Sequence, residues 1–187
     1  MDVKEAIEKR RAYRSFDTVV ITKELVDDLA SCARIAPSCF NKQPWRYVFV
    51  FGKEALPKFK EVLSPGNDWA RDSSMIIAVV SKKDLDCVMK DGREYYSYDV
   101  GMATAFMILR ATELGLIAHP IAGYDQKKAK EILKIPDDMT VITLVNVGKH
   151  ASDIKPSLNN EQAEVEKARP ERLPLDQIAF YDYYGKR

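Results

Sequence analysis

The sequence predicts an α+β (or α/β) sandwich, in which a sheet of few strands is covered by helices. Three observations predict this class. Short runs rich in β-branched and aromatic residues alternate along the chain with segments whose apolar residues recur at helical spacing. The length, 187 residues, suits one hydrophobic core. The share of hydrophobic residues, 46%, is close to the globular average, so that core can be filled.

Two helices are expected first. Asp2 and Glu5 have the spacing of a capping box, which predicts a short helix at the start of the chain. Thr22 is expected to cap a second helix with an apolar stripe. This helix must end near Pro37, because the residue before a proline avoids the helical region. Residues 37–45 then have the composition of a loop.

Three runs have the composition of strands, namely 46–51, 75–80 and 140–148. The second is unbroken and apolar, which is typical of a central strand covered on both faces. Shorter helices are expected at about 56–63 and 126–133.

A long helix is expected at about 94–113, with Gly115 in the position of a C-terminal cap. It is apolar or small on nearly every side, and a helix of this kind is usually buried. In a chain this short, complete burial is easiest across a subunit interface, so the sequence predicts a homodimer. No element is assigned to residues 116–123.

The composition changes at Lys149. Residues 149–187 are polar, contain three prolines, and show no periodicity of core quality before 178–184. We therefore expect a single domain, 1–187, in which 149–187 is an extended C-terminal arm over the surface.

Charge and cysteine usage exclude several functional classes. A formal net charge of +1 argues against nucleic acid and anionic membranes as partners. No apolar run reaches the roughly 18 residues that span a bilayer, and the N-terminus does not resemble a secretion signal. Cys32, Cys39 and Cys87 match no disulfide framework and, with His119 and His150, no zinc spacing. We expect reduced thiols, no metal and a cytoplasmic protein.

The common catalytic motifs are also missing. The chain has no G-x-S-x-G elbow, no Walker phosphate loop and no G-x-G-x-x-G. Acidic residues are plentiful but scattered. The chain is therefore either no enzyme, or an enzyme whose cofactor carries the chemistry, with no catalytic side chain of its own.

Five segments point to the second reading: EKRRAYRSF, ARIAPSCFNKQPW, YDVGMATAFMILRATELGL, HPIAGYD and ERLPLDQI, in that order. Together they resemble the nitroreductase family, and the resemblance covers essentially the whole chain. It implies an α+β nitroreductase-like sandwich with a mainly antiparallel central sheet, an intertwined homodimer, and FMN as cofactor.

The resemblance assigns the basic residues to the flavin. Arg10, Arg11 and Arg172 would bind the phosphate, since a guanidinium offers bidentate, charge-assisted hydrogen bonds. Arg14 would lie near the pyrimidine carbonyl of the ring and stabilise the anionic reduced flavin. Ala12 belongs to the same cofactor-binding motif and stands where the family usually has Ser.

The loop APSCFNKQPW implies contacts with the flavin of the other subunit. Pro37, Ser38 and Asn41 would reach that flavin, and the last two would supply hydrogen bonds. Gln43, together with Trp45, would hold the loop. Cys39 is expected to be a small buried filler without a cysteine partner.

The PIAG turn would place backbone groups beside the ring. Pro120, Ile121, Ala122 and Gly123 form this part of the expected cofactor site, and Ala122 stands where many relatives have Glu. His119, the ionisable group beside the turn, is a candidate substrate contact.

The implied reaction is ping-pong. NADH or NADPH would reduce bound FMN, and a small acceptor such as a nitroaromatic or a quinone would then be reduced, with protons from solvent. Two alternatives remain open: a flavin-binding carrier without turnover, and a reductase of activated alkenes or halogenated aromatics on the same fold. Because the connection 81–93 is short and polar, we expect one face of the flavin to be open.

Overall fold

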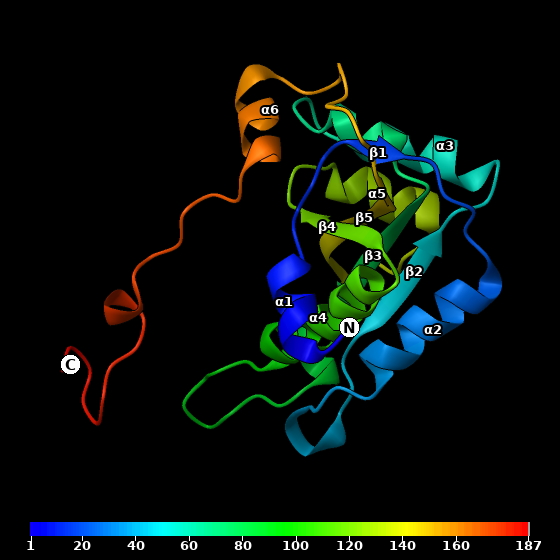
Figure 1. Ribbon diagram of the computed structural model, residues 1–187. Helices are drawn as coiled ribbons and strands as arrows, with labels where there is room; N and C mark the ends of the chain where they lie inside the picture. Colours follow the sequence, from blue (N-terminus) through cyan, green and yellow to red (C-terminus); the bar gives the residue numbers. More distant parts are fainter. Residues whose placement is uncertain (187) are drawn as a thin grey trace.

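A five-stranded antiparallel sheet with helices on both faces forms the body of the molecule (Figure 1). The computed structural model describes residues 1–186. In the sheet, β5 pairs with β1, β3 and β4, and β2 pairs with β3. All pairings are antiparallel, as expected. The strands are β1 (Phe16–Asp17), β2 (Arg46–Val50), β3 (Met75–Ser81), β4 (Leu116–Ile121) and β5 (Thr140–His150).

One face of the sheet packs against α3 (Ala55–Phe59) and α5 (Gln126–Leu133). The predicted helix 56–63 is shorter as an α-helix, because a 3₁₀ turn at Lys60–Val62 completes it. Every residue of β3 is buried, which confirms a central strand covered on both faces.

The other face packs against α2 (Lys23–Arg34) and α4 (Tyr96–Glu113), and α1 (Val3–Lys9) contacts α4. Local signals set these helices. Asp2 and Glu5 form the predicted capping box, and the Thr22 hydroxyl accepts a hydrogen bond from the Leu25 backbone N–H.

The strand β4, at 116–121, has no counterpart among the sequence predictions. It pairs with β5 along one side and contains Pro120, a residue that a central strand excludes because it lacks an N–H. Its position at the edge of the sheet explains both the missing periodic signal and the tolerance of proline.

Complete burial of the long helix is not found within one chain. Its inner face carries Val100, Ala103 and Met107, each at most 1% exposed. Its outer face carries Phe106, 40% exposed, and Tyr98, 64% exposed. The inner face of this helix is therefore buried, as its apolar sequence predicts, whereas its outer apolar face is exposed to solvent.

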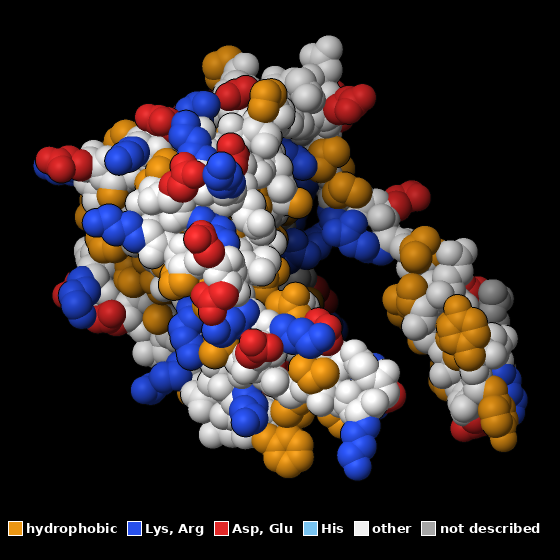
Figure 2. Space-filling model, turned by 180° about the vertical axis from the view of Figure 1, so that it is seen from behind, with side chains coloured by type: hydrophobic (Ala, Val, Ile, Leu, Met, Phe, Trp, Pro, Cys, Tyr) orange, Lys and Arg blue, Asp and Glu red, His pale blue; other side chains and the backbone are white. Residues whose placement is uncertain are grey.

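The arm is less extended than predicted. Residues 149–150 continue β5, and a further helix, α6 (Asn160–Lys167), lies against the body. Residues after α6 project from the body and carry exposed apolar side chains (Figures 1 and 2). These side chains are Leu173, Leu175, Ile178, Tyr181, Tyr183 and Tyr184.

Among residues 1–186, no helix combines the length and the apolar character that a membrane span requires.

Candidate functional site

A cluster of guanidinium groups lies where the segment after α1 meets the segment after α6. A cavity of about 170 Å³ opens between them. Basic side chains gather at the place where the arm leaves the body (Figure 2). The cavity is lined by Arg10, Arg11, Ala12, Arg14, Val165, Arg169, Pro170 and Arg172. Five of the residues expected to bind the cofactor, four arginines and Ala12, are therefore brought together.

Electrostatics show that this cavity favours an anion. Partial burial lowers the pKa of Arg10, and the positive charges of Arg169 and Arg172 lower it further. Like charges held this close repel one another, so an anion between them would relieve the repulsion. A phosphate group offers the matching charge and acceptor geometry.

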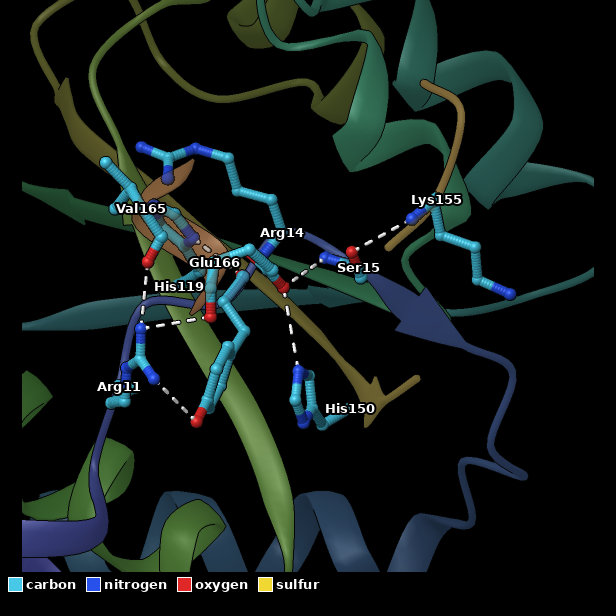
Figure 3. Close-up of polar contacts among 9 residues, drawn as sticks. Arg11, Arg14, Ser15, His119, His150, Lys155, Val165 and Glu166 are labelled. Carbon is cyan, nitrogen blue, oxygen red and sulfur yellow. Dashed lines mark hydrogen bonds and ion pairs between the residues drawn. The ribbon is translucent and has the colours of Figure 1, made fainter. Parts of the chain in front are cut away.

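Arg11 has a different place from the one expected. Its guanidinium donates to the backbone carbonyls of Val165, at 2.8 Å, and Glu166, at 3.2 Å (Figure 3). It also donates to the Tyr13 hydroxyl at 3.0 Å. Arg11 lines the cavity, but much of its hydrogen-bonding capacity is used to hold α6 against residues 10–14, which follow α1 and are called the arginine segment below.

Glu166 is the second fastening of this segment. Its carboxylate is 6% exposed and accepts hydrogen bonds from the backbone N–H groups of Arg14 and Ser15, at 2.9 to 3.1 Å (Figure 3). His150 Nε2 lies 3.6 Å from the same carboxylate. A buried carboxylate with several donors is well satisfied, so α6 holds the arginine segment in one conformation.

His119 lies inside the molecule, 6% exposed, and its ring packs on Trp69 with the centroids 4.6 Å apart. Its Nδ1 is 2.9 Å from the Tyr13 carbonyl, which can only accept, so Nδ1 carries the hydrogen. Burial lowers the pKa of His119 to about 4. The ring is therefore neutral near pH 7, and its position favours support of the arginine segment over contact with a substrate.

The turn 120–123 follows β4 and lies next to this support. Pro120 and Ala122 are exposed, whereas Ile121 is buried. The Gly123 carbonyl accepts from Asn67 Nδ2 at 2.8 Å, and any side chain at Gly123 would collide with that amide. A side chain at Gly123 would displace the Asn67 amide, so glycine preserves the hydrogen bond that keeps the turn against the body.

The loop 37–43 is a separate, tightly organised element. The Ser38 hydroxyl accepts from the Gln43 backbone N–H at 2.9 Å, and the Gln43 amide donates to the Asn41 carbonyl at 3.2 Å. Phe40, Asn41 and Gln43 all have left-handed backbone conformations, with φ of 47°, 55° and 51°. Asn41 is exposed at the rim of the loop.

Two further contacts fasten this loop. Asp99, near the start of α4, accepts from the Cys39 backbone N–H at 2.7 Å. Cys39 forms a disulfide with Cys87, and their Cα atoms are 6.1 Å apart. The expectations of reduced thiols and of no cysteine partner for Cys39 are therefore wrong for this pair. Cys32 is a free thiol.

The two groups of expected cofactor residues do not meet within one chain. The arginine segment and the turn 120–123 lie at one end of the body, and the loop 37–43 lies at the other (Figure 1). His119 joins the first two through Tyr13. A site that uses all of them must take the loop from a second copy.

Three residues that shape the site were missed or weighed too lightly: Arg169, Glu166 and Cys87. The only available signals were the basic residues around Pro170 and the cysteine count. An isolated Glu or Asp in a polar segment gives no sign that its partners lie 60 or more positions away.

Comparisons with known proteins identify the family and the fold of the chain. The model of the family described as Nitroreductase family matches residues 7–149. A Methanothermobacter thermautotrophicus protein named NADH dehydrogenase/NAD(P)H nitroreductase is 27% identical over 157 residues, which are 82% of this chain and 80% of that protein. An iodotyrosine deiodinase of Haliscomenobacter hydrossis is 26% identical over 170 residues, 76% of each chain.

A solved structure described as an oxidoreductase containing FMN is 30% identical and superposes with a TM-score of 0.85, covering 100% of this chain and 95% of that one. The family match spans most of the sequence, and the fold agrees over its whole length. The chain belongs to the nitroreductase family.

Proposed function

We propose that the protein is an FMN-dependent oxidoreductase that takes a hydride from NADH or NADPH and passes reducing equivalents to a small acceptor, such as a nitroaromatic or a quinone. We further propose that it works in the cytoplasm as a homodimer. Support comes from the family, from the names of the relatives, and above all from the cluster of guanidinium groups between the arginine segment and the arm.

The arginine cluster carries the proposal, because its chemistry matches the FMN phosphate. Arg10, Arg14 and Arg172 line a cavity of about 170 Å³, where burial and like charge already lower the pKa of Arg10. A dianionic phosphate neutralises that repulsion and accepts several charge-assisted hydrogen bonds. Arg169 also lines the cavity, while it donates to the Arg10 carbonyl at 2.8 Å.

FMN, held by these residues, would supply the redox chemistry, namely hydride transfer between the nicotinamide and the acceptor. The protein binds and orients. Arg14 would place positive charge beside the pyrimidine edge of the ring. The turn 120–123 would present main-chain groups to it, and neutral His119 keeps the Tyr13 backbone, and with it the arginine segment, in place. We assign no protein acid, so protons come from solvent.

A second copy of the chain would complete each site. Ser38 and Asn41 would reach the partner's flavin from a loop that lies at the far end of its own body. The exposed face of α4 and an apolar groove of about 300 Å³ beside α1 offer a surface for the second copy. The projecting arm, with its exposed tyrosines and leucines, would wrap around it.

The absorbance spectrum of the purified protein tests the proposal first. Bound FMN gives a yellow protein, and the flavin released by heat should be FMN and not FAD, because the arginine-lined cavity matches the single phosphate of FMN. NADH or NADPH should then bleach the spectrum anaerobically. A colourless protein that binds no added FMN would overturn the proposal.

Steady-state assays separate the alternatives. Turnover with nitroaromatics and quinones supports the proposed reaction. Bleaching without turnover of any acceptor would support a flavin carrier. Similarity to an iodotyrosine deiodinase makes halogenated aromatics a second candidate acceptor class, to be assayed in parallel with activated alkenes. The polar connection 81–93 favours an open flavin face and a broad range of acceptors.

A further inference from the structure

We propose that Cys39 and Cys87 form a reversible thiol–disulfide switch, whose oxidised form fastens the flavin-binding loop 37–43 to the connection 82–95. The proposal rests on the proposed function in two respects, namely that loop 37–43 contacts FMN and that the protein is cytoplasmic. The disulfide itself can be tested without any flavin.

The disulfide between Cys39 and Cys87 joins two segments that the proposed function places at the flavin site. Cys39 lies between Ser38 and Asn41, the two loop residues assigned to the cofactor. Cys87 lies 48 residues further along the chain, in the polar connection that leads into α4. The bond therefore joins the loop that would contact the flavin to the segment expected near the open flavin face.

The loop needs such fastening. Phe40, Asn41 and Gln43 adopt left-handed conformations that side chains disfavour, and such conformations persist only where the surroundings hold them. Asp99 and the Ser38 hydroxyl each hold one point of the loop. The disulfide is the covalent fastening, and its loss leaves the loop free to relax.

The connection 82–95 depends on the disulfide even more than the loop 37–43 does. Residues 88–94 are exposed, and within residues 1–186 they are held by local contacts only, which include the bridge between Val88 and Glu94, the hydrogen bond from the Met89 N–H to the Arg93 carbonyl, and the ion pair of Lys83 with Glu94. The Tyr95 backbone N–H donates to the Cys87 carbonyl. A segment with so few buried contacts moves readily once its covalent anchor opens.

Small reagents can reach the pair. Both cysteines are half-buried, and Cys39 lines a cavity of about 280 Å³ together with Met89, Tyr95 and Tyr98. In a cytoplasmic protein, a disulfide that small thiols can reach is more often transient or regulatory than structural.

A buried acid lies beside the sulfurs. A carboxylate oxygen of Asp86 and the two sulfur atoms all lie within 4.8 Å of one another. Asp86 Oδ1 accepts from the Cys87 backbone N–H at 2.7 Å, and the Asp99 carboxylate also lies close to Asp86. Burial, followed by the charge of Asp99, raises the pKa of Asp86. The carboxyl group of Asp86 therefore lies close enough to the sulfurs to influence the ionisation of either thiol.

The reaction balances with a low-molecular-weight disulfide as oxidant. A thiolate of the pair attacks one sulfur of the reagent, forms a mixed disulfide and releases one small thiol. The second cysteine then attacks the protein sulfur of the mixed disulfide and releases the other small thiol. Two electrons and two protons pass from the cysteines to the reagent, and an excess of small thiol reverses both steps.

The experiment compares the folded protein after oxidation with hydroxyethyl disulfide and after reduction with dithiothreitol, each followed by removal of the reagent. Alkylation and mass determination count the thiols. We expect one reactive thiol in the oxidised protein, from Cys32, and three after reduction and unfolding. The melting temperature should fall by roughly 5–10 °C on reduction, because a bond that closes a 48-residue loop is lost.

FMN titrations then link the bond to the site. We expect the reduced protein to bind FMN at least about threefold more weakly than the oxidised protein, a small but measurable difference. In Cys87→Ser, the oxidised and reduced samples should bind FMN alike. Cys32→Ala, which keeps the pair, should retain the difference.

Equal FMN affinities in the two wild-type states would overturn the switch while leaving the proposed function intact. An absence of FMN binding in both states would instead contradict the proposed function. Three thiols after oxidation, or protection of Cys39 and Cys87 from alkylation by Zn²⁺ alone, would also overturn the switch, the latter in favour of a metal site formed with Asp86.

Discussion

At the residue scale, the arginines that line the cavity differ in how many of their N–H donors already bond to other groups of the protein. Arg11 donates to Val165 and Glu166, and Arg169 donates to the backbone of Glu8 and Arg10. Arg10 lines the same cavity and is partly buried. Arg10 is therefore the guanidinium whose loss should be felt most directly by a phosphate.

Arg10→Ala should remove about 1.5–3 kcal/mol of charge-assisted hydrogen bonding, which weakens FMN binding about tenfold or more. Titration of the apoprotein with FMN, followed by flavin fluorescence, measures the change. Arg71→Ala is the matched control, since Arg71 is exposed and pairs with Asp68. Similar losses in the two variants would remove Arg10 from the site.

His119 makes a prediction about pH. Its pKa is near 6.5 when unfolded and about 4 in the fold, so between these values the unfolded chain binds a proton that the folded chain does not. The contribution of the neutral His119 ring to the free energy of unfolding is therefore complete above pH 6.5, and it is lost as the pH falls from 6.5 toward 4. The full loss is on the order of 3 kcal/mol.

Urea unfolding of the wild type and of His119→Asn, at pH 7 and pH 5, isolates this contribution. Asn is neutral at both values and keeps an N–H that can reach the Tyr13 carbonyl. The wild type should lose more stability than the variant between the two values. Equal losses would mean that the ring becomes protonated inside the fold.

At the scale of elements, α6 is the unexpected part of the site. It begins with a capping box between Asn159 and Gln162 and places Glu166 under the arginine segment. A helix of eight residues is marginal by itself, so its stability depends on this docking. The arginine segment and α6 thus hold each other in place.

Glu166→Ala should leave the buried backbone N–H groups of Arg14 and Ser15 without a partner, and lower the free energy of unfolding by about 2–3 kcal/mol. FMN should also bind more weakly, because the arginine segment is less fixed. Glu164→Ala is the control, as Glu164 is exposed and pairs with Lys167. Urea unfolding measures the stability, and unchanged stability in Glu166→Ala would contradict the role of α6.

At the scale of the whole molecule, two features favour assembly with a second copy of the chain. The outer apolar face of α4 is exposed, and the arginine segment lies at the other end of the body from the loop 37–43 (Figure 1). Gly101 lies on that face, and a Cβ built there meets nothing within 4 Å in the single chain. A large side chain is therefore tolerated by the monomer fold but not by a helix packed closely against α4.

Gly101→Leu should shift the protein from dimer to monomer in sedimentation, and FMN occupancy should fall with it, because each site would need Ser38 and Asn41 from the other copy. Lys127→Leu, on the exposed side of α5, is the control and should remain dimeric. A Gly101→Leu protein that stays dimeric and flavin-loaded would place the interface elsewhere.

The sequence by itself determined the elements that local patterns specify. Asp2 and Thr22 cap helices through backbone groups three positions away, and the apolar run 75–80 forms a strand wherever it is buried. The order of the motifs also indicated the family and the mainly antiparallel sheet, and the basic cluster near the N-terminus predicted where a phosphate would be bound.

The tertiary structure alone decided what depends on distant partners. Strand β4 exists because β5 offers it an edge, Glu166 is a buried anchor because Arg14 and Ser15 lie beside it, and Cys39 finds Cys87 across 48 residues. Short-range periodicity carries no information about such contacts, since the energy that specifies them comes from burial and from hydrogen bonds formed only after the chain has folded.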